Sequence, residues 1–249
     1  MEFLAIIPAR YASTRFPGKP LTIISGKTMI ERVYEQSCKA FENVYVATDN
    51  NRIFETVTNF GGRVVMTKTS HVNGTSRVLE AMTQIEKLRG THCKYVINIQ
   101  GDEPFIQPEQ LKELSKCFND PQTEIATLVK RITNSNDLFS PNTPKVVLGK
   151  TNQALYFSRS PIPYLRDLPS DKWLDNSIYY KHIGLYGYKR ETLIDIVGME
   201  PSSLEKAESL EQLRWLENGV KIVVSETAFE SHSIDTPQDL DKLKANNII

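Results

Sequence analysis

The chain has 249 residues, 40% of them hydrophobic, and is therefore long enough to bury a full core in one large domain or two small ones. Its 30 basic residues balance its 30 acidic residues, which excludes a global field that would draw it onto nucleic acid or an anionic membrane. The absence of a signal peptide and of any apolar stretch near the length of a membrane span predicts a cytoplasmic protein.

Apolar runs alternate with helical patterns in the first half of the chain. Buried strands are predicted at residues 4–8, 44–48, 64–67 and 95–99. Between them, apolar residues recur at helical spacing, as at Ile30, Val33 and Tyr34. Strand and helix alternation predicts βαβ units, and therefore an α/β fold with a largely parallel sheet flanked by helices. Ligands bind such sheets beyond the carboxyl ends of the strands.

After Pro121 the predicted strands come closer together, at residues 124–132, 145–148, 155–157, 182–188 and 222–225. No linker separates the halves, so we expect a single domain over 1–249 with a mixed-sheet extension at about 124–190. The polar stretch 166–177 is predicted to be a flexible loop. Two helices are expected to close the chain, one at about 203–218 and one beginning at Thr236.

The loop after the first strand carries three cations, Arg10, Arg15 and Lys19, together with the Ser13 and Thr14 hydroxyls. Arginine supplies forked donors, lysine supplies a point charge, and the backbone N–H groups of a tight loop reach further oxygens. The pattern favours a site for a nucleoside triphosphate over a solvated basic loop.

The strand predicted at 95–99 ends in Gln100, Gly101 and Asp102, which places a carboxylate at the ligand edge of a parallel sheet. A hard cation beside phosphates needs such an oxygen ligand, and Mg²⁺ is the natural choice. A helix cap is the alternative for Asp102, although the basic loop favours the metal. Asp235 offers a second carboxylate, but acids before a helix are also stabilising without a ligand. Asp49 is expected to shape a turn or to start a helix.

The segment 71–77 also suits an anion, because Thr75 and Arg77 fall in the first turn of a predicted helix. Backbone donors there, with Arg77, could hold either a substrate carboxylate or a nucleotide. His71 is interpreted as structural, because a lone histidine has no catalytic role without a partner.

The strand at 182–188 places His182 and Tyr186 at even spacing on one face, where they could line a sugar pocket or form ordinary sheet surface. Glu211 and Gln212 lie on the helix predicted at 203–218, where such side chains are usually solvated.

Four motifs occur together in one order: the loop 10–21, the strand end 100–104, the strand 182–188 and the run Ile234-Asp235-Thr236-Pro237. In this combination the chain closely resembles the 3-deoxy-D-manno-octulosonate cytidylyltransferase family, also called CMP-Kdo synthetases, from Phe3 to about Leu243. The resemblance implies a Rossmann-like nucleotidyltransferase fold, a homodimer, Mg²⁺, and transfer of CMP from CTP to 3-deoxy-D-manno-octulosonate (Kdo) for lipopolysaccharide assembly.

The resemblance also implies roles for individual residues. Lys19, Asp102 and Asp235 match the catalytic positions, and the two aspartates match the magnesium ligands. The nucleotide-binding positions are Arg10, Ser13, Arg15, Lys19 and Thr75. The positions that contact the acidic sugar are Arg77, Gln100, His182, Tyr186, Glu211 and Gln212. Family dimers pair through the region that matches roughly 145–164.

One position departs from the family pattern, which commonly has Gly-Thr-Asp-Arg where this chain has Gly74-Thr75-Ser76-Arg77. The missing negative charge leaves open another acidic sugar, such as an amino-substituted Kdo or a sialic-type acid. Transfer of a guanylyl or uridylyl group to a neutral sugar, a non-catalytic nucleotide-binding module and a purely structural interaction protein are further alternatives. A neutral sugar would leave Arg77 and the His182 strand without an acid to bind. A non-catalytic module would be marked by loss of Lys19, Asp102 or Asp235, and all three are present. A structural protein would leave the anion-binding segments unexplained.

Overall fold

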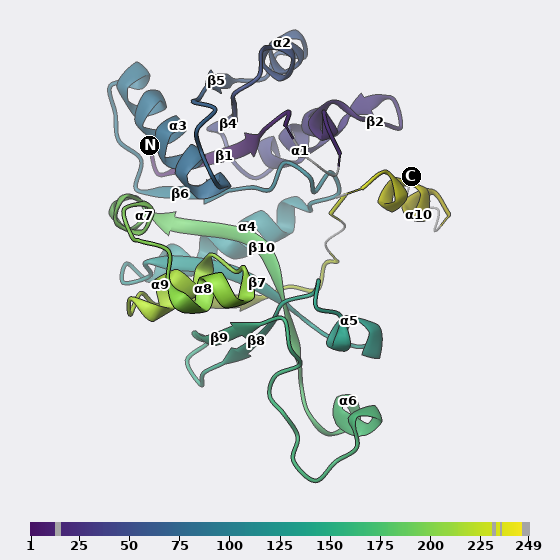
Figure 1. The fold of residues 1–249 in the computed structure, drawn as a ribbon. Coiled ribbons are helices and arrows are strands. Elements are labelled where there is room, and N and C mark those ends of the chain that lie inside the picture. Colours follow the sequence, from purple (N-terminus) through teal and green to yellow (C-terminus); the bar gives the residue numbers. More distant parts are fainter. Residues whose placement is uncertain (13–15, 231–232, 235, 246–249) are drawn as a thin grey trace. The chain divides into compact units, whose positions relative to one another are not determined.

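The computed structural model describes residues 1–12, 16–230, 233–234 and 236–245. The chain falls into two compact units, whose elements are labelled in Figure 1. Unit 1 comprises Met1–Lys112 and Ser231–Ile249, and unit 2 comprises Glu113–Glu230. The expectation of one domain with an extension at about 124–190 stays a prediction.

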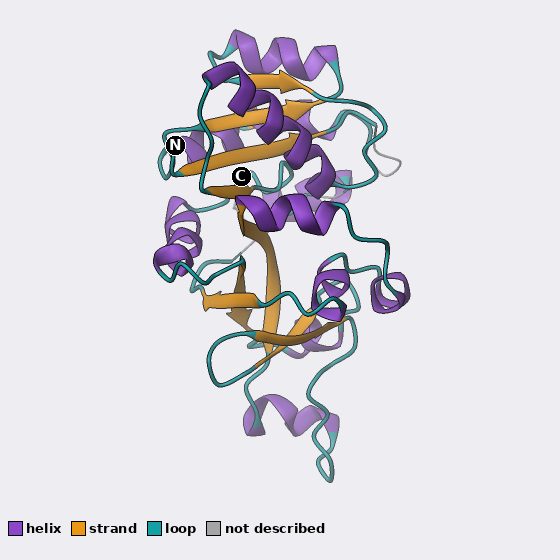
Figure 2. Cartoon of the chain, turned by 90° about the vertical axis from the view of Figure 1, so that its left-hand side faces the viewer, coloured by secondary structure: helices purple, strands orange, loops and turns teal. Residues whose placement is uncertain are grey.

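Unit 1 is built on four parallel strands in the order β6-β1-β4-β5. These strands are β1 (Phe3–Ala9), β4 (Val44–Thr48), β5 (Val64–Met66) and β6 (Tyr95–Asn98). The helices that connect them are α1 (Met29–Cys38), α2 (Asn51–Asn59) and α3 (Gly74–Arg89). Right-handed crossovers in this order put α1 and α2 on one face of the strands and α3 on the other. Figure 2 shows these strands as neighbouring arrows that point the same way, with helices alongside.

The local sequence explains where these helices begin. Thr28, Asn50 and Asn73 each accept a hydrogen bond from a backbone N–H in the first turn of α1, α2 and α3. Such caps satisfy N–H groups that have no partner inside the helix. Leu4 to Ile7 of β1 are fully buried, as expected for a central parallel strand.

The remaining elements of unit 1 are short. They are the 3₁₀ turn η1 (Lys19–Leu21), the hairpin strands β2 (Ile23–Ile24) and β3 (Lys27–Thr28), and α10 (Pro237–Ala245). The helix α4 (Pro108–Lys116) runs from unit 1 into unit 2 and is followed by the 3₁₀ turn η2 (Cys117–Asn119). Within the described part of the chain, no helix is both long enough and apolar enough to cross a membrane.

Unit 2 has mixed strand pairing. Strand β7 (Ile125–Arg131) pairs parallel with β11 (Ile222–Glu226) and antiparallel with β10 (Tyr180–Lys189). Strand β8 (Lys145–Leu148) lies antiparallel to both β10 and β9 (Ala154–Ser158). Its helices are α5 (Ser135–Phe139), α6 (Trp173–Asn176), α7 (Arg190–Val197), α8 (Ser203–Glu208) and α9 (Gln212–Glu217). The predicted α/β class, with mixed, mostly parallel strands flanked by helices, is confirmed.

The prediction of a loop over all of 166–177 is wrong, because part of this stretch is helical. It contains the 3₁₀ turn η3 (Ser170–Lys172) and the helix α6. Trp173 is 6% exposed and stacks on Tyr179 with ring centroids 6.3 Å apart. Trp173 thus anchors this polar segment in a small cluster of buried residues that also contains Ile132 and Leu138.

The prediction of one helix over 203–218 is also wrong. Two helices, α8 and α9, occupy the stretch, and Ser209 between them has a φ of 51°, in the left-handed region. Arg214 of α9 binds Glu205 of α8 through Nε and Nη2 at 2.7 and 2.6 Å. The apolar positions alone do not reveal this corner, because their helical spacing continues across it.

Candidate active site

A pocket of about 240 Å³ lies within unit 1, beyond the carboxyl ends of β1 and β6. The residues around it come from three segments: the end of β1 with η1, the start of α3, and the turn after β6. They are Pro8, Ala9, Arg10, Lys19, Pro20, His71, Val72, Asn73, Gly74, Arg77, Gln100, Gly101 and Asp102. Five of the predicted site residues thus surround one pocket: Arg10, Lys19, Arg77, Gln100 and Asp102.

The turn after β6 approaches β1 closely. A Cβ added at Gly101 would lie 2.9 Å from the Pro8 carbonyl oxygen, so a side chain there would force the two segments apart. Glycine at this position therefore keeps Asp102 beside the end of β1. The backbone N–H of Ile234 donates to the Asp102 carbonyl at 2.9 Å, which attaches the segment before α10 to the same turn.

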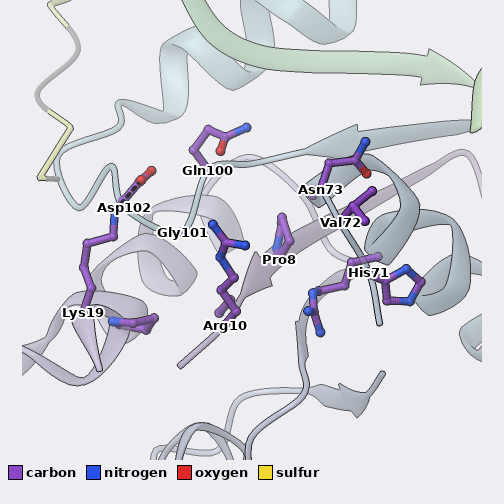
Figure 3. Close-up of a pocket in the computed structure, with 13 residues that line it drawn as sticks. Pro8, Arg10, Lys19, His71, Val72, Asn73, Gln100, Gly101 and Asp102 are labelled. Carbon is purple, nitrogen blue, oxygen red and sulfur yellow. Dashed lines mark hydrogen bonds and ion pairs between the residues drawn. The ribbon is translucent and has the colours of Figure 1, made fainter. Parts of the chain in front are cut away.

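Lys19 and Asp102 form an ion pair at one side of the pocket (Figure 3). Lys19 Nζ lies 2.7 Å from Asp102 Oδ2, with the side chains 15% and 26% exposed. Arg10 stands between this pair and the wall that carries His71 and Asn73. Since α4 begins only at Pro108, Asp102 does not cap that helix, and the alternative interpretation of Asp102 as a cap is wrong.

Three predicted site residues, Ser13, Arg15 and Asp235, lie outside the described residues. Thr75 is described and is 3% exposed in the first turn of α3. No group of three or more histidine, cysteine, aspartate or glutamate side chains within the described ranges could hold a metal ion.

Arg77 lines the pocket but is bound to protein groups. Its side chain is 4% exposed; Nη2 donates to Asp49 Oδ2 and Nη1 to Thr67 Oγ1, each at 2.6 Å. The expectation that Asp49 starts a helix is wrong, because Asn50 caps α2. Asp49 instead holds the Arg77 guanidinium, which joins the ends of β4 and β5 to the start of α3.

His71 is held at both ring nitrogens. Nε2 is bound by Glu80 Oε2, and Nδ1 lies 3.1 Å from Ser76 Oγ. Burial favours the protonated form of Glu80, but the hydrogen bonds from His71 and the Lys68 N–H outweigh it and lower the pKa of Glu80. The glutamate is therefore a carboxylate that accepts, and His71 Nε2 donates to it. These contacts agree with the structural interpretation of His71.

Of the four predicted sugar contacts in unit 2, Tyr186 and Gln212 are buried and His182 and Glu211 are half-buried. His182 Nε2 lies 3.0 Å from Thr127 Oγ1, and burial lowers the pKa of His182 to about 3, so the ring is neutral near pH 7. Burial also raises the pKa of the Tyr186 phenol. Gln212 Nε2 has no hydrogen-bond partner among the described residues, whereas the Tyr186 hydroxyl interacts with the Thr127 side chain. Glu211 is half-buried where α9 begins.

Strand β10 is irregular between His182 and Tyr186. Its register against β7 shifts between Ile183 and Tyr186, and the Thr127 hydroxyl lies within hydrogen-bond distance of the Ile183 and Leu185 carbonyls, at 3.2 and 2.8 Å. The even spacing of the two polar side chains is therefore interrupted by a bulge.

The motifs did not predict that Asp49 binds Arg77, nor any role for Thr67 and Thr127. Asp49 directly follows the strand predicted at 44–48 and Thr67 ends the strand predicted at 64–67, so a position at a strand end is the signal that could have identified them. Thr127 lies inside a buried strand and offers no such signal.

Residues 4–222 match the family model described as Cytidylyltransferase. A 3-deoxy-manno-octulosonate cytidylyltransferase of Parabacteroides distasonis is 54% identical over 98% of both chains. An enzyme of the same name from Bacteroides thetaiotaomicron is 56% identical over 96% of both chains. The chain belongs to the 3-deoxy-manno-octulosonate cytidylyltransferase family. The family membership expected from the four motifs is thereby confirmed.

A solved structure of the family has the same fold. It is a CMP:2-keto-3-deoxy-manno-octonic acid synthetase complexed with CTP, 40% identical, with a TM-score of 0.89. The alignment covers 100% of this chain and 99% of that one. The nucleotidyltransferase fold implied by the motifs is therefore confirmed for this cytidylyltransferase.

Proposed function

We propose that the protein transfers CMP from CTP to Kdo, giving CMP-Kdo and diphosphate for lipopolysaccharide biosynthesis. The observation that carries this proposal is that Arg10, Lys19 and Asp102 surround one pocket in a chain that is more than half identical to cytidylyltransferases of that name. Two cations and one carboxylate suit a triphosphate and a divalent ion.

The nucleotide half of the site is proposed to consist of Arg10, Ser13, Arg15, Lys19 and Thr75. Arg10 and Lys19 would neutralise charge that grows on the leaving diphosphate. Lys19 first has to exchange its partner, because Asp102 binds Nζ at 2.7 Å before substrate enters. We infer that CTP takes over the lysine and leaves Asp102 free for a metal ion.

Asp102 and Asp235 are proposed to hold Mg²⁺. The fit rests on the donor set: Asp102 lines the pocket, and Ile234, the residue before Asp235, donates its backbone N–H to the Asp102 carbonyl. Magnesium is usually held by one or two carboxylates together with substrate phosphates and water, so three protein ligands are not required. When bound, the ion would polarise the α-phosphate and lower the pKa of the attacking hydroxyl.

The acidic sugar is proposed to contact Arg77, Gln100, His182, Tyr186, Glu211 and Gln212. Gln212 supports this set, because its buried Nε2 has no partner among the described residues, as a group awaiting a ligand would. His182 is neutral, so it would contact a sugar hydroxyl rather than the carboxylate. Arg77 could pair with that carboxylate only with donors that Asp49 and Thr67 leave free.

The proposed reaction is a direct displacement. The anomeric 2-hydroxyl of Kdo attacks the α-phosphorus of CTP, the bond to the β-phosphate oxygen breaks, and diphosphate leaves with that oxygen. The protein residues orient the two anionic substrates and carry no covalent intermediate. A homodimer that pairs through residues 145–164, and a cytoplasmic location, complete the proposal.

The test measures diphosphate released from CTP with Mg²⁺, with and without Kdo, and with amino-substituted and sialic-type acids in place of Kdo. We expect release only with an acidic sugar, and fastest with Kdo. Faster release with another acid would change the proposed substrate but leave the reaction type intact. No release with any acidic sugar would refute the proposal.

A further inference from the structure

The wall of the pocket at residues 67–74 connects β5 to α3 and is held by few backbone hydrogen bonds. Thr67 N–H donates to the Thr48 carbonyl at 2.7 Å, and beyond this point side chains of α3 hold the segment. His71, Val72, Asn73 and Gly74 from this wall line the pocket. The shape of that side of the pocket therefore depends on the contacts that side chains of α3 make with this segment.

One face of α3 carries Ser76, Glu80 and Gln84, which follow one another at intervals of four residues. Gln84 Nε2 donates to the Met66 carbonyl at 3.0 Å, and Glu80 Oε2 accepts from the Lys68 N–H at 3.1 Å. Glu80 also binds His71, while Ser76 Oγ lies 3.1 Å from His71 Nδ1. The three side chains thus hold Met66, which precedes the wall, and Lys68 and His71 within it.

Ser76 acts through His71, since it is not among the residues that line the pocket. Its hydroxyl also lies 3.2 Å from the Asn73 carbonyl. A hydroxyl both donates and accepts. It can therefore donate to Nδ1 when the ring carries one proton, or accept from Nδ1 and donate to Asn73 when the ring carries two. A carboxylate at position 76 could only accept a hydrogen bond. It would therefore bind Nδ1 only when the ring carries its second proton.

We propose that Ser76, His71 and Glu80 form a positioning unit that fixes the 67–74 wall, and that the Ser76 hydroxyl makes this unit independent of the ring's protonation. None of the three is a catalytic residue, and the unit acts on substrate only through the wall. In this reading Ser76 affects the stability of the wall over the pH range and leaves the choice of acidic sugar unchanged.

Other charged groups near the wall are paired or exposed. Arg77 donates to the Lys68 carbonyl at 3.4 Å and is neutralised by Asp49, while the Lys68 side chain is exposed. Arg10 and Lys19 line the same pocket, with Asp102 bound to the lysine. Glu80 is the carboxylate that binds the His71 ring.

The test is hydrogen exchange of the backbone amides of residues 67–74 in the whole protein, expressed as protection factors. We expect Glu80→Ala and Ser76→Ala to reduce protection about tenfold while β1 is unchanged, since each loses a hydrogen bond to the ring. Glu35→Ala on α1 is the matched control, because the pair that Glu35 forms with Lys27 is exposed. Unchanged protection at 67–74 in both wall variants would overturn the proposal.

The Ser76→Asp variant tests the role of the hydroxyl. In this variant, protection of residues 67–74 should be about tenfold lower in mildly basic than in mildly acidic buffer, because a carboxylate binds Nδ1 only when the ring carries both protons, while the unaltered protein keeps its protection. Equal pH profiles in the two proteins would contradict the inference. A kinetic measurement rests on the proposed CMP transfer: Glu80→Ala should raise the KM for CTP, for Kdo or for both, and leave kcat within about twofold. Because exchange needs no turnover, failure of the proposed function would leave this test intact.

Discussion

Asp102 illustrates how one side chain serves two states of the site. Without substrate it is neutralised by Lys19 at 2.7 Å, and in the proposed reaction it carries the metal ion while the lysine binds phosphate. Asp102→Asn should therefore lower kcat at saturating CTP and Kdo by at least about 100-fold, because metal polarisation contributes several kcal/mol to the barrier. Steady-state diphosphate release measures this effect. The exposed Glu109→Gln on α4 is the control, and near-normal turnover of Asp102→Asn would exclude a metal role for this residue.

Arg77 and Asp49 are predicted to stabilise the fold as a pair. Their side chains are 4% and 12% exposed, so Asp49→Ala leaves a buried guanidinium with an uncompensated charge. The free energy of unfolding should fall by about 3–5 kcal/mol in urea titrations. Glu35→Gln, which breaks an exposed pair, should cost at most about 1 kcal/mol. Equal losses in the two variants would mean that the Arg77–Asp49 pair is not specially stabilising.

His182 should make the protein sensitive to acid. Its pKa is lowered to about 3 by burial, whereas the unfolded chain binds the proton near the ordinary value of 6.5. The unfolded state thus holds one more proton between these values, and stability falls as the pH drops from about 6.5 toward 3. Urea unfolding of His182→Gln over this range should lack a slope equivalent to about one bound proton. Parallel curves for the two proteins would show that His182 is not buried as a neutral ring.

The residues at strand ends were the predictable part of the site. Arg10, Gln100 and Asp102 were placed together because carboxyl ends of parallel strands meet at one edge, and they do line one pocket. The partner of Arg77 was not predictable, because Asp49 lies 28 residues away and several strand-end acids competed for the same role.

At the scale of elements, each predicted strand lies within two residues of its observed bounds, since apolar runs that end in turn residues mark such strands directly. The two-residue strands β2 and β3 were not predicted, because they are too short to form an apolar run. The helices α8 and α9 were merged into one because apolar spacing continues through Ser209. What separates them is local hydrogen bonding: Ser202 and Glu205 form a reciprocal cap at the start of α8. The hydrogen bonds from Arg214 of α9 to Glu205 of α8 then fix the corner between the two helices.

The α8–α9 corner should depend on the forked shape of Arg214. The guanidinium binds both Glu205 oxygens and donates to the Met199 carbonyl at 2.9 Å, which a lysine could not reproduce. Arg214→Lys should lower the free energy of unfolding by about 1.5–3 kcal/mol, the usual worth of hydrogen bonds to charged groups. Chemical denaturation measures the loss, and exposed Lys206→Arg on α8 is the control. A loss no larger than that of the control would show that charge alone holds the corner.

At the scale of the whole molecule, the family resemblance supplied what strand and helix patterns could not. Periodicity predicted an α/β chain, but the assembly of a homodimer was implied only by the family, through the region 145–164. The structure shows two large side chains in this region exposed to solvent, Leu155 at 54% and Tyr164 at 74%. These two side chains are therefore the positions at which the implied interface can be tested.

A homodimer through this region makes a direct prediction for the oligomeric state. Stable interfaces bury roughly 1,200–2,000 Å² and depend most on apolar and aromatic residues at their centre, so a charge placed there should dissociate the dimer. We expect the unaltered protein to sediment as a dimer at micromolar concentration and Leu155→Glu to sediment as a folded monomer. Ile194→Glu, at 41% exposure on α7 outside the region, should remain dimeric. A monomer in the unaltered protein, or a dimer that survives Leu155→Glu and Tyr164→Glu together, would place the contact elsewhere or exclude it.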